Sequence, residues 1–112
     1  MRFKSQLKDK TAIVGIGATE FSKDSGRSEL RLALEAIHAA LDDAGLQHSD
    51  VDGYSIYSID NNPVSEVNRY LGGGDLKFFS NVHYGGGAAC GTIAHASMAI
   101  VALAALSRTQ IV

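Results

Sequence analysis

The sequence FFSNVHYGGGAACGTIAHASMAIVALAALS covers residues 78–107 and contains no Asp, Glu, Lys or Arg. We take this stretch as the unit that decides the fold. Leu76–Val82 has the composition of a strand, and Ala88–Leu106 has that of a helix with almost no polar face. Gly85-Gly86-Gly87 lies between them, where the backbone can adopt conformations that side chains forbid. A strand, a glycine turn and a helix start that presents N–H groups together predict a place for reactive chemistry.

A charge-free helix of this length has two explanations. It could span a membrane, which takes about 20 strongly apolar residues. It could instead be enclosed by other protein elements on all sides. The helix is rich in Ala and carries Gly91 and the polar residues Thr92, His95 and Ser97, a composition that favours enclosure. We therefore expect a buried central helix and no membrane span.

Composition narrows the class of protein. The 112 residues suit one domain with a modest core, and the net charge of −2 gives no basic field for nucleic acid. A single cysteine excludes an internal disulfide and is typical of a reducing compartment. The N-terminus has no apolar run typical of a signal peptide. We expect a soluble, cytoplasmic protein.

The first half of the chain shows a strand and an amphipathic helix. Thr11–Ile16 is a short apolar run that predicts a strand covered on both faces. Ser28 is the expected N-cap of a helix that carries apolar residues at helical spacing from Leu30 to Ala44. Gly45 is the expected residue after its C-terminus. His38 falls on the outer face of this helix, as a solvated histidine would.

The second half continues the alternation. Val51–Ile59 predicts a strand in which Tyr54 and Tyr57 are packing residues. Asn62-Pro63 predicts the N-cap and first residue of a short helix that ends at Gly72. A new β-branched run begins at Thr109, and Ser107-Arg108 are expected to close the long helix. The order β-α-β-α-β-α-β predicts an α/β fold with parallel strands. The run at the C-terminus could be a short edge strand, but we favour the interpretation that the sequence is the N-terminal piece of a longer protein.

Familiar cofactor motifs are missing. Gly15-Ile16-Gly17 lacks the third glycine of a dinucleotide fingerprint, because Glu20 stands in its place. No lysine follows the glycine cluster, which excludes a phosphate-binding P-loop. The four histidines lack ligand spacing with one another or with Cys90, so we expect no metal site; they are His38, His48, His83 and His95.

The remaining candidates surround the glycine cluster. His83 and Tyr84 lie where the strand ends, the place at which substrates approach α/β sheets, although both could simply pack under the turn. Cys90 falls near a helix N-terminus, where a thiol can become a nucleophile. A free cysteine in an apolar helix is more often a small buried residue, and that is the interpretation we favour from the sequence.

Two segments resemble one family. GIGATEFSKDSGRSELRLA at Gly15–Ala33 is similar to the opening of thiolase-superfamily proteins of the lipid-transfer and sterol-carrier type. KFFSNVHYGGGAACGTIAHASMAI at Lys77–Ile100 resembles the unit that carries the thiolase nucleophile. More narrowly, both resemble the bacterial thiolase-like aldolases of steroid side-chain degradation, and the resemblance extends over nearly the whole chain.

The resemblance implies a thiolase-like fold, in which two βαβαβαββ halves enclose two central helices. Residues 1–112 would be an incomplete N-terminal half, with Ala88–Leu106 as one of the enclosed helices. It also implies a homodimer, a coenzyme A thioester as substrate rather than a bound cofactor, and a DUF35-type partner with an OB-fold and a zinc ribbon. The implied reaction is retro-aldol cleavage of a steroid side chain, which releases propionyl-coenzyme A and a 17-keto steroid.

The sequence departs from the family pattern at the nucleophile. When the helices are aligned, Gly86 occupies the position of the thiolase cysteine, Ala88 and Ala89 occupy the small positions, and Cys90 comes four residues late. Glycine cannot form an acyl-enzyme, whereas aldol cleavage needs only a base and stabilisation of an enolate. The departure therefore fits an aldolase. The residues His83, Tyr84, Gly85, Gly86 and Gly87 are the predicted substrate-binding site.

Two alternatives stay open at this point. A shifted alignment would make Cys90 the nucleophile of a thiolase or acyltransferase acting on acyl-coenzyme A. A different class of function is a non-catalytic assembly module, whose exposed sheet edge and helix must be covered by a second copy or a partner.

Overall fold

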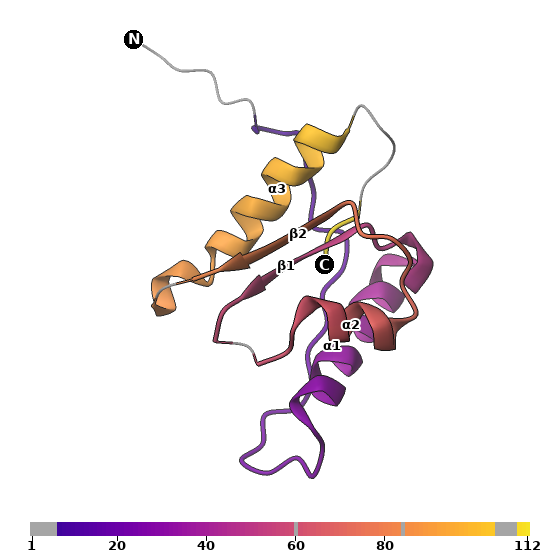
Figure 1. The fold of residues 1–112 in the computed structure, drawn as a ribbon, viewed down its shortest axis with the longest axis vertical. Coiled ribbons are helices and arrows are strands. Elements are labelled where there is room, and N and C mark those ends of the chain that lie inside the picture. The colour runs from indigo at the N-terminus through magenta and orange to yellow at the C-terminus, as the bar shows by residue number, and fades with distance from the viewer. Residues whose placement is uncertain (1–6, 60, 84, 105–109) are drawn as a thin grey trace.

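The computed structural model of the protein describes residues 7–59, 61–83, 85–104 and 110–112. A two-stranded parallel sheet of β1 (Gly53–Tyr57) and β2 (Phe78–Val82) forms the middle layer. Helix α3 (Gly91–Leu103) covers one face of this sheet, and helices α1 (Glu29–Ala44) and α2 (Val64–Leu71) cover the other (Figure 1). Two short 3-10 helices, η1 (His48–Asp50) and η2 (Gly86–Ala88), complete the described elements. The predicted α/β class with parallel strands is confirmed.

Helix α1 begins and ends at the positions that its capping residues predict. The Ser28 hydroxyl accepts the backbone N–H of Arg31 at 3.2 Å, which satisfies one donor of the first turn. Gly45 adopts a left-handed conformation with φ of 70°, and its N–H bonds to the carbonyls of the last turn. The expected N-cap and C-terminal glycine are therefore confirmed, and His38 is exposed as predicted.

The unit β1–α2–β2 is a parallel crossover. Gly53 pairs with Phe78 and Tyr57 with Val82, so the carboxyl ends of both strands meet at one edge of the sheet. The strand predicted at Val51–Ile59 is shorter than expected. The predicted short helix is α2, which ends at Gly72 with φ of 79°. Pro63 rather than Asn62 occupies the N-cap position, a shift of one residue from the prediction.

The strand predicted at Thr11–Ile16 is wrong in this structure. The segment belongs to no sheet, and the side chains of Ile13 and Ile16 are 72% and 76% exposed. The place beside β1 is taken by the C-terminal residues instead. The N–H of Val112 donates to the Gly53 carbonyl at 2.9 Å, and the N–H of Ser55 donates to the Val112 carbonyl at 2.7 Å. The predicted last strand therefore appears as a parallel bridge at Ile111, while its predicted start at Thr109 lies outside the described residues.

The glycines at 15 and 17 serve helix packing. A Cβ on Gly15 would lie 2.3 Å from the carbonyl oxygen of Ala40, and one on Gly17 would lie 2.2 Å from that of Ala36. The backbone of this segment thus touches the backbone of α1 directly, which a larger residue would prevent. The sequence Gly15-Ile16-Gly17 is therefore explained by packing.

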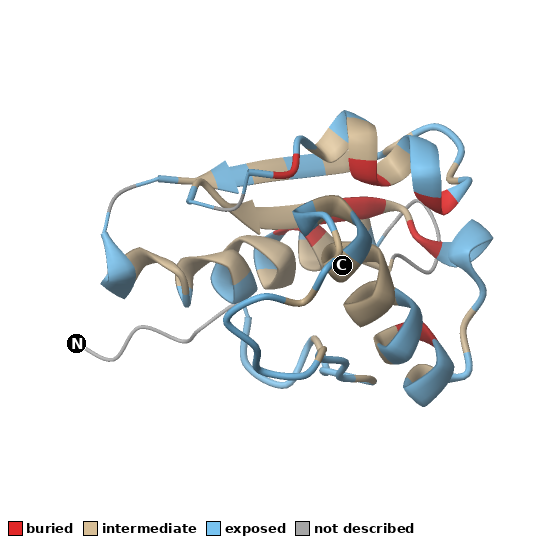
Figure 2. Cartoon of the chain, turned by 90° about the horizontal axis from the view of Figure 1, so that it is seen from below, coloured by how far each residue is buried: buried red, intermediate tan, exposed pale blue. Residues whose placement is uncertain are grey.

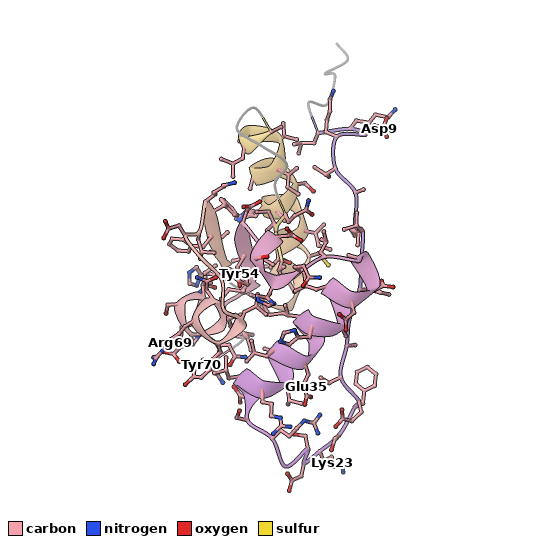
Figure 3. All side chains as sticks on the ribbon, turned by 90° about the vertical axis from the view of Figure 1, so that its right-hand side faces the viewer. Asp9, Lys23, Glu35, Tyr54, Arg69 and Tyr70 are labelled. Atoms are coloured by element: carbon pink, nitrogen blue, oxygen red, sulfur yellow. The ribbon has the colours of Figure 1, made fainter. Side chains whose placement is uncertain are left out.

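The hydrophobic core lies between the sheet and the two amphipathic helices. Tyr54, 1% exposed, is its largest fully buried side chain. Figure 2 shows buried residues on α1, α2 and β1, and Figure 3 shows Tyr54 between these elements. The buried cluster consists of Leu41, Val51, Tyr54, Val67 and Leu71. The core is thus centred on Tyr54, not on the long apolar helix that the sequence singles out.

The expected enclosure of α3 is wrong for this chain. Ala99 is its one buried residue, while Ile93 and Met98 are 55% and 46% exposed. The reason is geometric, because α3 packs against β1 and β2 with one side only. Gly86–Leu103 has a mean hydropathy of 1.5 and is long and apolar enough to cross a membrane. Core helices of soluble proteins meet the same criteria, so this is weak evidence for a membrane span. The expected helix end at Leu106 and the closing pair Ser107-Arg108 lie outside the described residues.

A network of ion pairs fixes the loop before α1. The Arg27 guanidinium contacts the carboxylate of Glu20 at 2.6 Å and that of Glu35 at 3.0 Å. Arg31 adds a contact to Glu35 at 3.4 Å, one turn away on the helix. The loop is thereby tied to the outer face of α1.

Candidate functional site

The glycine turn joins β2 to α3 as the sequence predicts. β2 ends at Val82, η2 covers Gly86–Ala88, and α3 begins at Gly91. Gly85 has φ of 62° and ψ of 160°, a conformation that is essentially restricted to glycine. A side chain at position 85 would therefore strain the backbone, and the turn requires glycine there for geometric reasons.

The turn is open on its outer side. A Cβ on Gly85, Gly86 or Gly87 would meet no atom within 4 Å. At the base of the turn the packing is close, because a Cβ on Gly91 would lie 3.4 Å from Cγ1 of Val82. The helix start is thus held against the strand end, while the space beside the three glycines is open.

The predicted site residues are brought together in part. Gly85, Gly86 and Gly87 form the turn, and His83 is an exposed residue directly after β2. Tyr84 lies outside the described residues. The roles of these residues in binding a substrate stay predictions.

Cys90 is not the buried residue that we favoured from the sequence. It is exposed and occupies the N-cap position of α3. The reason for the difference is that the turn continues as η2 through Ala88, so the α-helix starts later than predicted and Cys90 precedes it. An exposed thiol at a helix start is more consistent with a reactive cysteine than a buried thiol would be.

Tyr57 belongs to this site and was missed by sequence reasoning, which placed it among the packing residues. Its hydroxyl donates a hydrogen bond to the Gly85 carbonyl at 2.5 Å. The available signal was its position, because the last residue of a parallel strand lies beside the exit of the next strand. Tyr54, the other tyrosine of β1, is a packing residue as predicted.

Two cavities flank α3, and neither is lined by residues 85–90. One has a volume of about 590 Å³ and lies between residues 11–16, α1, α3 and residues 110–112. The other, of about 380 Å³, lies between β2 and α3 and contains Ser80 and His95. Among the described residues, no three His, Cys, Asp or Glu side chains gather as a metal site would require.

Comparisons with known proteins find relatives whose names all state a lyase or an aldolase. No family model matches the sequence. The chain is 60% identical over 94 residues to the 17-hydroxy-3-oxo-4-pregnene-20-carboxyl-CoA lyase of Mycobacterium tuberculosis, matching 84% of this chain and 24% of that protein. It is 59% identical over 96 residues to the steroid side-chain-cleaving aldolase of Thermomonospora curvata, matching 86% of this chain and 25% of that protein.

A solved structure described as Ltp2-ChsH2(DUF35) aldolase superposes with a TM-score of 0.83 and 58% identity, covering 88% of this chain and 26% of that one. The backbone arrangement of this chain is therefore similar to part of an aldolase. The chain spans about a quarter of the length of the curated relatives it matches.

Proposed function

We propose that this chain carries the glycine turn of a carbon–carbon lyase that cleaves the side chain of a steroid coenzyme A thioester. The observation that carries the proposal is the identity of about 60% to two proteins whose names state this activity or this class of substrate. In this proposal the chain is the incomplete N-terminal half of a thiolase-like domain, and the reaction is performed by the whole protein.

The reaction proceeds as a retro-aldol cleavage. A base takes the proton of the hydroxyl on the ring carbon that carries the side chain, this oxygen becomes the ketone of the steroid, and the bond between that carbon and the side chain breaks. The electron pair of that bond passes to the coenzyme A fragment as an enolate, which is protonated to propionyl-coenzyme A. The protein must therefore supply a base, an acid and stabilisation of the enolate.

The geometry of the turn supports this role. The space above Gly85–Gly87 is open, and the sequence resemblance aligns Gly86 with the nucleophile of a thiolase. In this proposal the thioester therefore binds at the turn without a covalent step. Coenzyme A enters as part of the substrate and not as a resident cofactor. By analogy with the Ltp2-ChsH2(DUF35) aldolase, the partner is a DUF35-type protein, and we expect a homodimer in the cytoplasm.

The test is an assay of the full-length protein together with its DUF35-type partner. We expect release of propionyl-coenzyme A from 17-hydroxy-3-oxo-4-pregnene-20-carboxyl-CoA, measured by mass spectrometry. Gly86→Val should lower activity at least about tenfold, because its side chain fits the fold and fills the open space of the turn. Gly74→Val is the matched control, since position 74 is equally open and precedes β2, at the opposite end of that strand from the turn. Equal activity in both variants would contradict a binding role for the turn.

The exposure of Cys90 favours a second candidate, a cysteine-dependent thiolase or acyltransferase. This candidate predicts fast labelling of Cys90 by iodoacetamide and complete loss of activity in a folded Cys90→Ala variant. The lyase predicts full activity in that variant. The two candidates are therefore separated by one substitution.

The uncovered side of α3 favours a third candidate, an assembly module without activity of its own. Ile93 and Met98 on α3 and Phe79 on β2 are all exposed apolar residues. We expect the 112-residue chain to self-associate or to bind a partner. A folded monomer in sedimentation experiments at low micromolar concentration would contradict this expectation.

A further inference from the structure

The carboxyl ends of the two strands place Tyr57 beside the glycine turn. Tyr57 pairs in register with Val82, and the N–H of Ser58 donates to the Val82 carbonyl at 2.8 Å. Side chains alternate along a strand, so Tyr57 and Ser55 share one face. That is the α3 face, because the Ser55 hydroxyl donates to the Thr92 carbonyl of α3 at 2.8 Å. Tyr57 therefore projects toward the turn that leads from β2 into α3.

The Tyr57 hydroxyl reaches the residue of the turn whose backbone conformation only glycine adopts readily. It donates to the carbonyl of Gly85, which is the glycine with φ of 62°. The same carbonyl accepts the N–H of Ala88 at 3.0 Å, the bond that closes η2. The Gly85 carbonyl oxygen thus accepts one hydrogen bond from within the turn and one from the neighbouring strand β1.

A peptide unit is planar, so fixing its carbonyl also fixes the direction of the next N–H. The two hydrogen bonds at the Gly85 carbonyl therefore determine the orientation of the whole Gly85–Gly86 peptide unit. Among the residues that the structure describes, the other hydrogen bonds of residues 85–90 are local to the turn and the start of α3. Glycines have the greatest conformational freedom of all residues, so a turn of three glycines needs an external contact of this kind to keep one geometry.

We propose that Tyr57 is a positioning residue for the lyase reaction, whose hydroxyl holds the Gly85–Gly86 peptide unit in the orientation that receives the coenzyme A thioester. This inference rests on the proposed function. It assigns Tyr57 no contact with the substrate and no proton transfer. Its effect passes through the geometry of the turn.

The chain offers a matched control on the same strand. Tyr54→Phe also removes one phenolic hydroxyl from β1, but on the opposite face, where that hydroxyl donates to Oδ1 of Asn68 at 3.3 Å. A merely structural role for Tyr57 would make the two variants alike, with a lower melting temperature and unchanged kinetics. A positioning role for Tyr57 would instead lower the kcat of Tyr57→Phe alone.

The experiment compares Tyr57→Phe, Tyr54→Phe and the wild type in the full-length protein with its DUF35-type partner. We expect Tyr57→Phe to lower kcat about tenfold, the order expected for loss of one hydrogen bond, and to speed deuterium uptake in peptides covering residues 83–90. Tyr54→Phe should change neither. Unchanged kcat in Tyr57→Phe, with or without faster exchange, would overturn the positioning role. An inactive wild type would overturn the proposed function, and the exchange data would then show separately whether Tyr57 holds the turn.

Discussion

The Ser80 hydroxyl lies 2.6 Å from Nδ1 of His95, which links the middle of β2 to the middle of α3. On the neighbouring strand, the Ser55 hydroxyl bonds to the Thr92 carbonyl. Ser55 and Ser80 are register partners, and Thr92 and His95 lie one helical turn apart. Two adjacent serines therefore hold an apolar helix in a defined position on the sheet.

Loss of the Ser80–His95 contact should loosen α3. We expect Ser80→Ala to lower the free energy of unfolding by about 1 kcal/mol, the usual contribution of a partly buried hydrogen bond. In a double-mutant cycle with His95→Ala, most of this loss should appear as coupling between the two residues. The measurement is urea denaturation followed by circular dichroism. Ser65→Ala, at an exposed position of α2, is the control and should leave stability nearly unchanged.

Gly17→Ala should destabilise the packing of residues 11–17 on α1. The new Cβ would meet the Ala36 carbonyl oxygen, so the segment must move away, at a cost of about 2 kcal/mol. Gly74→Ala meets nothing within 4 Å and should be neutral or slightly stabilising. Thermal unfolding of both variants measures the difference. Equal melting temperatures would show that the glycines at 15 and 17 have another purpose.

The Tyr54 phenol should titrate late. Burial raises the pKa of Tyr54 above the usual tyrosine value of 10.0. A raised pKa means that the folded state holds the phenol proton up to a higher pH than the unfolded state does. The contribution of the neutral Tyr54 phenol to the free energy of unfolding is therefore fully present below pH 10 and is lost as the pH rises through the pKa of the folded state. Absorbance at alkaline pH should therefore show a late phenol that is missing in Tyr54→Phe. An identical titration curve in the variant would contradict the burial of this hydroxyl.

The Glu20–Arg27 ion pair should make the stability of the fold slightly dependent on pH in the acid range. Hydrogen bonding to Arg27 lowers the pKa of Glu20 below the usual value of 4.5. Its contribution to stability is therefore present above pH 4.5 and is lost as pH falls through the folded value. Glu20→Gln should reduce the difference in melting temperature between neutral and acid pH. Because Glu20 is exposed and Arg27 is partly exposed, added salt should weaken the effect in the wild type.

Local sequence signals predicted the elements whose causes are local. Ser28, Gly45 and Gly72 mark helix ends in the structure as they do in the sequence, because capping depends on a few neighbouring atoms. The glycine turn was equally predictable. Its backbone conformation at Gly85 follows from the absence of a side chain.

Features that depend on which elements meet in space could not be predicted. Thr11–Ile16 has the composition of a strand, yet residues 110–112 occupy the edge of β1 that it would need. The apolar composition of α3 indicated enclosure, but composition does not say whether the covering elements are present in the chain. The position of Tyr57 near the end of a predicted strand was a signal in the sequence, but its contact with Gly85 depends on the strand register, which a single sequence does not reveal.

The outer edge of β2 has a practical consequence. Within the described residues β2 has a strand neighbour on one side only, so the peptide groups of its other side face outward, next to the exposed ring of Phe79. Such a border can template pairing between molecules. Bacterial expression of the 112-residue chain by itself should yield inclusion bodies. Asn81→Lys, at an exposed position of the same strand, should shift the product toward the soluble fraction.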